Sequence, residues 1–76
     1  MLQRLKNWIE YGDEIEFRVH GKTYVVTPLE GSVVAIGAAY EDDLEFPDVD
    51  SMMNLYIIDG QPLKNVVEDI EIERVY

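Results

Sequence analysis

The sequence predicts a small α+β domain with an N-terminal helix, a three-stranded antiparallel meander, one or two short helices and a C-terminal strand. Polar and apolar residues alternate over Glu14–Val19 and again after a two-residue loop, which is the pattern of a β-hairpin. An amphipathic segment, Met1–Tyr11, precedes the hairpin and can cover its apolar face. Alternation returns at Glu68–Tyr76, and no linker interrupts the chain, so we expect residues 1–76 to form a single domain.

The N-terminal segment, Met1–Tyr11, is predicted to be a helix that ends at Gly12. Its apolar residues recur at helical spacing and are Leu2, Leu5, Trp8 and Ile9. We expect Trp8 to pack on the hairpin, because a domain this small needs its largest apolar side chain in the core.

The hairpin loop is predicted at His20-Gly21, and a two-residue loop sets the strand register. The predicted opposing pairs are Val19 with Lys22, Phe17 with Tyr24, and Ile15 with Val26. The buried face is then expected to hold Ile15, Phe17, Val19, Tyr24 and Val26. Such a loop needs positive φ at both positions, which histidine tolerates less well than asparagine or glycine.

The second strand is predicted to end at Pro28, in a turn that runs to Gly31. A third strand is predicted over Ser32–Tyr40. One of its faces carries only small or medium side chains, where another element can approach closely. Short links between successive strands favour an antiparallel meander.

The segment Glu41–Asp50 has six acids in ten residues and no base. We interpret it as a loop that leads to a helix capped by Asp48 or Asp50. This helix is expected to run to about Leu55 or Tyr56. Its buried side is expected to include Met52, Met53 and Leu55.

The remaining chain is predicted to form a buried pair, Ile57-Ile58, a turn at Asp59-Gly60 and a short helix, Pro62–Val67. Glu68–Tyr76 is predicted to be a strand at a sheet edge. Strict alternation would place Ile70, Ile72, Arg74 and Tyr76 on one face.

The formal net charge is −10, from 16 acids and 6 bases, and cysteine is absent. This balance argues against direct binding of nucleic-acid phosphates or anionic membranes, and it favours a basic protein partner or simple solubility. Without a disulfide or a long apolar run, we expect a cytoplasmic protein that does not insert into membranes.

Catalytic residues are not predicted, and neither is a cofactor or a metal site, so we expect a protein that is not an enzyme. The sequence contains two serines, Ser32 and Ser51. The lone histidine, His20, is expected at an exposed turn with few partners to orient it. A calcium loop that begins at Asp48 would need oxygen ligands where Met52 stands.

Two stretches, GDEIEFRVHGKTYVV and DVDSMMNLYIIDGQPLKNVVEDIEIE, carry a resemblance. In them the chain resembles a group of small, acidic, uncharacterised proteins of Gram-positive bacteria and their prophages. The shared features are structural, and the resemblance implies a phage or mobile-element setting without implying catalytic residues.

The leading functional hypothesis is an acidic protein-interaction module, with a basic partner held by Glu41, Asp42, Asp43 and Glu45. A specific form is a phage anti-defence inhibitor that imitates nucleic acid on a basic host protein. Two alternatives remain open, a weak divalent-metal-binding protein and a structural oligomeric protein. We expect a monomer or a weak homodimer.

Overall fold

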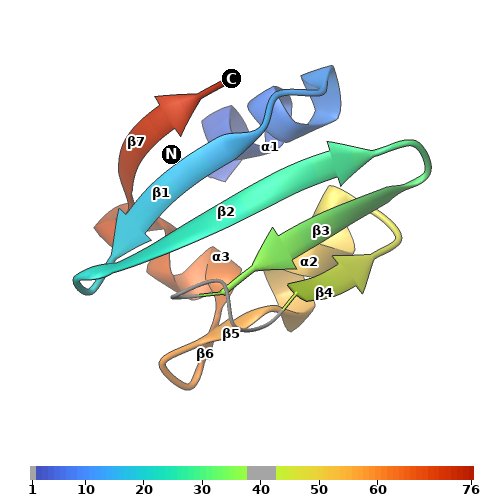
Figure 1. The fold of residues 1–76 in the computed structure, drawn as a ribbon. Helices are drawn as coiled ribbons and strands as arrows, with labels where there is room; N and C mark the ends of the chain where they lie inside the picture. The colour runs from blue at the N-terminus through green and yellow to red at the C-terminus, as the bar shows by residue number, and fades with distance from the viewer. Residues whose placement is uncertain (1, 38–42) are drawn as a thin grey trace.

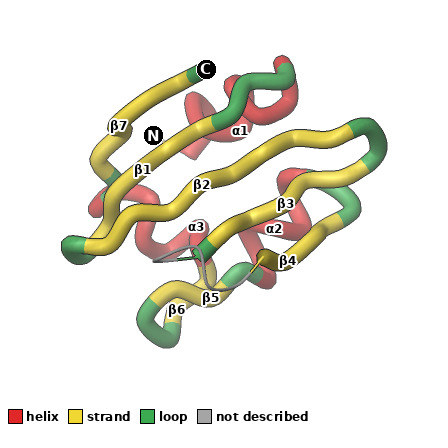
Figure 2. Tube along the Cα trace, viewed as in Figure 1, coloured by secondary structure: helices red, strands yellow, loops and turns green. Residues whose placement is uncertain are grey.

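The computed structural model of the chain describes residues 2–37 and 43–76. Five antiparallel strands form one sheet in the order β4-β3-β2-β1-β7 (Figure 1). They are β1 Ile15–Val19, β2 Lys22–Leu29, β3 Ser32–Ile36, β4 Asp43–Phe46 and β7 Glu71–Val75. The helices α1 Leu2–Tyr11, α2 Val49–Leu55 and α3 Leu63–Val66 all lie on one face of this sheet (Figure 2). The α+β class, the N-terminal helix, the meander, the short helices and the C-terminal strand are therefore confirmed.

The β1–β2 hairpin has the predicted register, with Phe17 opposite Tyr24. Its turn residues His20 and Gly21 have φ of 52° and 79°. Both positions are thus left-handed, as a tight two-residue loop requires, and histidine accepts this conformation here. The whole predicted apolar face is buried, namely Ile15, Phe17, Val19, Tyr24 and Val26.

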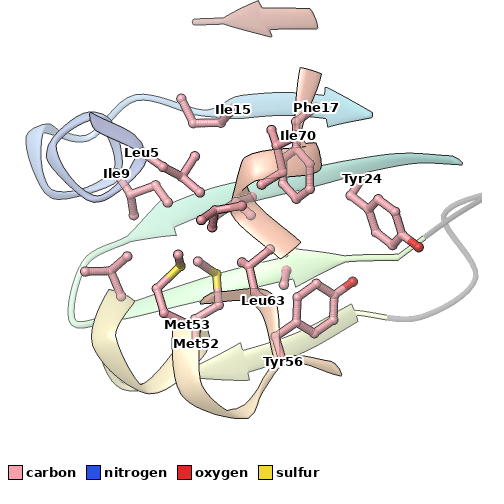
Figure 3. Close-up of a cluster of buried hydrophobic side chains, with 14 of the residues drawn as sticks. Leu5, Ile9, Ile15, Phe17, Tyr24, Met52, Met53, Tyr56, Leu63 and Ile70 are labelled. Carbon is pink, nitrogen blue, oxygen red and sulfur yellow. The ribbon is translucent and has the colours of Figure 1, made fainter. Parts of the chain in front are cut away.

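The core lies between this face of the sheet and the helices (Figure 3). Phe17 stacks on Tyr24 with 5.6 Å between ring centroids, and Tyr24 meets the edge of Tyr56 at 6.4 Å. Trp8 is half-buried and packs against the core cluster, while Arg4 lies over its ring at 5.0 Å. Full burial of one such large apolar side chain stabilises the fold by about 1.5–3 kcal/mol, so the helices depend on this sheet face.

Strand β2 continues through Pro28 to Leu29, so the prediction that proline ends the strand is wrong. The pairing of β1 with β2 stops at Ile15 and Val26, and β3 is the only described strand that pairs with Pro28. Proline is tolerated where a strand has one neighbour, because its missing N–H then leaves no ladder bond unmade. The described part of the third strand ends at Ile36, and the predicted stretch 38–40 lies outside the described residues.

The acidic segment is not a loop throughout, because Asp43–Phe46 forms β4 and pairs antiparallel with β3. Acidic residues have low intrinsic preference for strands, which is why the sequence favoured a loop. Pairing with the apolar strand β3 and burial of Phe46 override that preference. Glu41 and Asp42 lie outside the described residues.

Helix α2 begins as predicted, with Asp48 as its N-cap. An oxygen of the Asp48 carboxylate accepts the backbone N–H of Ser51 at 2.7 Å, and this bond lowers the pKa of the Asp48 carboxyl. The buried residues of α2 are Val49, Met52 and Met53. Leu55 is 64% exposed and Ile57 is 56% exposed, so their predicted burial is wrong. Leu55 lies to one side of the helix face that the buried positions of α2 define, so it does not point into the core.

Two short strands, β5 Ile57–Ile58 and β6 Gln61–Pro62, surround the predicted Asp59-Gly60 turn. Helix α3 starts one residue later than predicted, with Pro62 in the N-cap position. A 3₁₀ turn, η2 Val67–Asp69, then occupies residues that were predicted to begin the last strand. The predicted position of β7 at a sheet edge is confirmed.

The register of β7 against β1 shifts between Glu16 and Phe17. Phe17 pairs with Ile72, whereas Glu16 pairs with Arg74, so Glu73 is the extra residue of a β-bulge. Residues directly opposite each other share a face, so Arg74 lies on the outer face while Ile72 faces the core. The prediction that Arg74 shares a face with Ile72 is therefore wrong, because strict alternation cannot anticipate a bulge.

Candidate interaction surface

The distribution of positive charge divides the chain. Between Lys22 and Lys64 the sequence has no lysine, arginine or histidine, but it has eight acidic residues. This base-free stretch supplies most of β2, all of β3 and β4, and helix α2. One side of the sheet is therefore built from segments that carry only negative charge.

Strand β4 is an edge of the five-stranded sheet, paired with β3 on one side alone. Asp43 and Glu45 are exposed on it, and Leu44 between them is 50% exposed. Asp43 and Glu45 share the outer face of the sheet, since Phe46 and the opposite residue Val33 are buried on the inner face. The Glu45 carboxylate accepts a hydrogen bond from the Ser32 hydroxyl at 3.2 Å.

Two of the four residues predicted to bind a basic partner, Asp43 and Glu45, are thus brought together on one exposed edge. We call Asp43–Phe46 the acidic edge. The other two, Glu41 and Asp42, precede it in the chain and lie outside the described residues. Counting acids identified this segment in the sequence, but only the pairing with β3 makes it a strand edge.

The opposite edge carries bases as well as acids. Arg74 Nε lies 3.5 Å from a Glu16 oxygen, and Arg18 Nε lies 3.1 Å from a Glu73 oxygen. Hydrogen bonds and attraction to acidic neighbours raise the pKa of Arg74, with the bond from its guanidinium to the Tyr76 hydroxyl as the largest cause. On this side, positive side chains already pair with acids across the strands.

A groove of about 480 Å³ lies near the C-terminal end of β4, where α1 ends and α2 begins. Its lining residues include Ile9, Glu10, Pro28, Val33 and Asp48. Lys6 Nζ pairs with an oxygen of Asp50, another lining residue, at 2.6 Å. Sequence reasoning missed this groove because its residues come from segments that are far apart along the chain.

The lone histidine has more partners than the sequence suggested. His20 Nδ1 lies 2.6 Å from an Asp59 oxygen, and His20 Nε2 lies 3.1 Å from an Asp69 oxygen. The bond to Asp59 and then the bond to Asp69 raise the pKa of His20 above its usual value. The contact with His20 lowers the pKa of Asp59. A second oxygen of the Asp59 carboxylate lies 3.9 Å from Lys22 Nζ.

This cluster, which we call the histidine clasp, joins the hairpin tip to the β5–β6 turn and to η2. A protonated imidazole can donate from both ring nitrogens, one to each carboxylate. In that protonated state neither nitrogen has a free lone pair for proton abstraction or metal binding, and the clasp links three segments of the fold. The prediction that His20 has few orienting partners is wrong, because Asp59 and Asp69, from distant parts of the chain, both contact its ring.

Among residues 2–37 and 43–76, no three or more histidine or acidic side chains are placed so that they could hold a metal ion. The same residues include no helix with the length and apolar character needed to cross a membrane. Comparison with protein-family models, curated proteins and solved structures found no match to this chain.

Proposed function

We propose that this protein is a non-enzymatic interaction module that binds a basic protein through its acidic edge. The supporting observation is that Asp43 and Glu45 project from one face of an edge strand whose only strand partner among the described residues is β3, with exposed Leu44 between them. No base occurs in the sequence between Lys22 and Lys64, the stretch that contains this edge. A partner that carries lysine or arginine would be attracted here and would not have to displace an internal ion pair of the described edge.

The proposed setting is the cytoplasm of a Gram-positive bacterium that carries a phage or a mobile element. In that setting, a host protein that holds nucleic acid offers the basic surface that an acidic edge would attract. An anti-defence inhibitor that occupies such a surface is one specific form of the proposal. Its support is the charge of the chain together with the resemblance of its sequence.

The test is affinity capture from a Gram-positive lysate with three forms of the protein. The first is the native chain, and the second has Asp43→Asn and Glu45→Gln. The third is a matched control with Glu68→Gln and Glu71→Gln, two exposed acids outside the acidic edge. Both double variants remove two negative charges, so comparing them separates the effect of the acidic edge from the effect of net charge.

We expect a basic protein that the native chain and the control retain at low salt and that the edge variant loses. Raising the salt concentration should release it, because screening weakens attraction between exposed charges. Equal loss of the captured protein with both double variants would show a response to net charge alone and would overturn the proposal. Capture that persists in high salt would also overturn it.

A further inference from the structure

Among the described residues, the acidic edge has backbone hydrogen-bonding groups on one side that no other strand pairs with, in addition to its charge. A strand paired on one side leaves alternate backbone N–H and C=O groups pointing outward on the other side. In the described sheet, β4 has β3 as its only strand partner. The register of the β3–β4 pair has no shift, so the outer edge of β4 is a regular strand edge.

The side chains of the acidic edge specify what an added strand would look like. Directly opposite residues of paired strands share a face. Side chains opposite Asp43 and Glu45 would therefore lie on the outer face, where lysine or arginine is favoured. Side chains between them would lie on the face of Leu44 and Phe46, where apolar residues are favoured.

A second copy of this chain fits the edge poorly. Antiparallel pairing of two β4 strands that keeps the inner faces together would place acids of one copy opposite acids of the other. Like charges directly opposite each other destabilise a strand pair. The charge pattern therefore favours a partner strand of opposite sign.

We propose that the partner binds by β-strand addition, as an extended segment that pairs with β4 and alternates basic with apolar residues. This inference rests on the proposed function and adds the mode of binding and the sequence pattern of the partner. Main-chain hydrogen bonds supply affinity in this mode, and the alternating side chains supply selectivity.

The probe is a short synthetic peptide that alternates lysine and valine, titrated into the isotopically labelled protein at low salt. A block peptide of the same composition, with all lysines before all valines, keeps the charge but loses the alternation. Two further peptides carry N-methyl groups on every valine or on every lysine. Each removes the N–H donors from one edge of the peptide strand.

We expect the alternating peptide to shift the backbone amide signals of Asp43–Phe46 more than those of Glu71–Val75. The block peptide and one N-methylated peptide should bind at least about tenfold more weakly, because they lose main-chain bonds or side-chain alignment. The other N-methylated peptide should bind as well as the parent, since its modified edge faces solvent.

Equal affinity for all four peptides would overturn strand addition while leaving attraction to basic partners intact. Equal loss with both N-methylated peptides, or larger shifts at β7, would overturn it as well. If no peptide binds at low salt, both this inference and the proposed function fail. The variant with Asp43→Asn and Glu45→Gln should reduce binding of the alternating peptide, whereas the variant with Glu68→Gln and Glu71→Gln should not.

Discussion

The two edges of the sheet differ in the regularity of their strand register and in the pairing of their charged side chains. At β7, a bulge at Glu73 interrupts the register, and Arg74 and Arg18 pair with acids across the strands. At β4, the register is regular, and the exposed side chains include two acids and a leucine.

An unpaired edge invites pairing with another chain, and proteins commonly disrupt or charge such edges. The β7 edge uses both devices, and its Arg74 and Glu73 side chains form ion pairs with residues of β1. The β4 edge carries charge of one sign, which would disfavour pairing with another copy of this chain and, in the proposed function, would attract a basic segment. On this comparison, we expect the bulge to disfavour strand pairing at β7, whereas the like charges of β4 disfavour pairing with another copy of the same strand.

The largest expected effect is on stability and separates the interior strand β1, the neighbour of β7, from the edge strand β4. Phe17 is fully buried opposite Ile72 of β7, so Phe17→Ala should lower the free energy of unfolding by about 3–5 kcal/mol. Leu44→Ala on β4 should change it by no more than about 0.5 kcal/mol. Urea denaturation followed by Trp8 fluorescence measures both.

If Phe17→Ala does not fold, the smaller change Phe17→Leu should still lower stability more than Leu44→Ala does. Comparable losses in the free energy of unfolding for Phe17→Ala and Leu44→Ala would contradict the assignment of Leu44 to an edge that contributes little to stability.

The next effect is on self-association and concerns the acidic edge. Glu45→Lys would place an introduced lysine two residues from Asp43, so that antiparallel pairing of two edges brings opposite charges together. We expect this variant to dimerise at concentrations where the native chain stays monomeric. Sedimentation at several concentrations tests this, with Glu68→Lys as a control of the same net charge. Equal dimerisation of both variants would contradict a role for the edge.

A weaker tendency to associate is expected when the bulge is removed. Deletion of Glu73 leaves Ile72 opposite Phe17 and Arg74 opposite Glu16 in a regular strand. The β7 edge would then be open to pairing, and a concentration-dependent dimer should be detectable by sedimentation. Glu73→Gln removes the same charge but keeps the extra residue, so it should remain as monomeric as the native chain.

The smallest effect is the pH dependence of the histidine clasp, which lies beside the start of β7 and not at β4. The folded-state pKa of His20 is raised above its unfolded value, so its stabilising contribution is complete below about pH 6.5 and is lost as pH rises through the folded pKa. The pKa of Asp59 is lowered, so its contribution is present above about pH 4 and is lost as pH falls through the folded pKa.

The melting temperature of the native chain should therefore exceed that of His20→Asn most clearly at about pH 5, and the difference should shrink in alkaline solution. Asparagine suits this variant because it tolerates the positive φ of position 20. In the native chain, raising the pH should also increase normalised hydrogen exchange in Glu71–Val75 more than in Asp43–Phe46. A pH-independent difference in melting temperature would argue against a charged clasp.

Local signals were sufficient for the parts of the fold that short-range geometry controls. The two-residue loop at His20-Gly21 and the alternation on both sides set one register, since a slip of one residue would turn the apolar face outward. Asp48 was recognisable as a cap because a carboxylate before a helix satisfies free amide groups. For the candidate site, the acids of Glu41–Asp50 were visible in the composition, and the structure places Asp43 and Glu45 on its surface.

The features that local signals missed all depend on contacts between distant residues. An acidic run became β4 because β3 was available to pair with it, and the bulge at Glu73 arose where β7 meets β1. The partners of His20 lie 39 and 49 residues away in the chain.

The sequence by itself determined the α+β class, the hairpin register and the acidic character of the protein, because periodicity, turn geometry and charge act over a few residues. Only the tertiary structure decided which acids lie on a sheet edge, which strand carries the bulge and what His20 contacts. Those outcomes depend on pairing and packing energies between distant segments, which outweigh the weak preferences of individual residues.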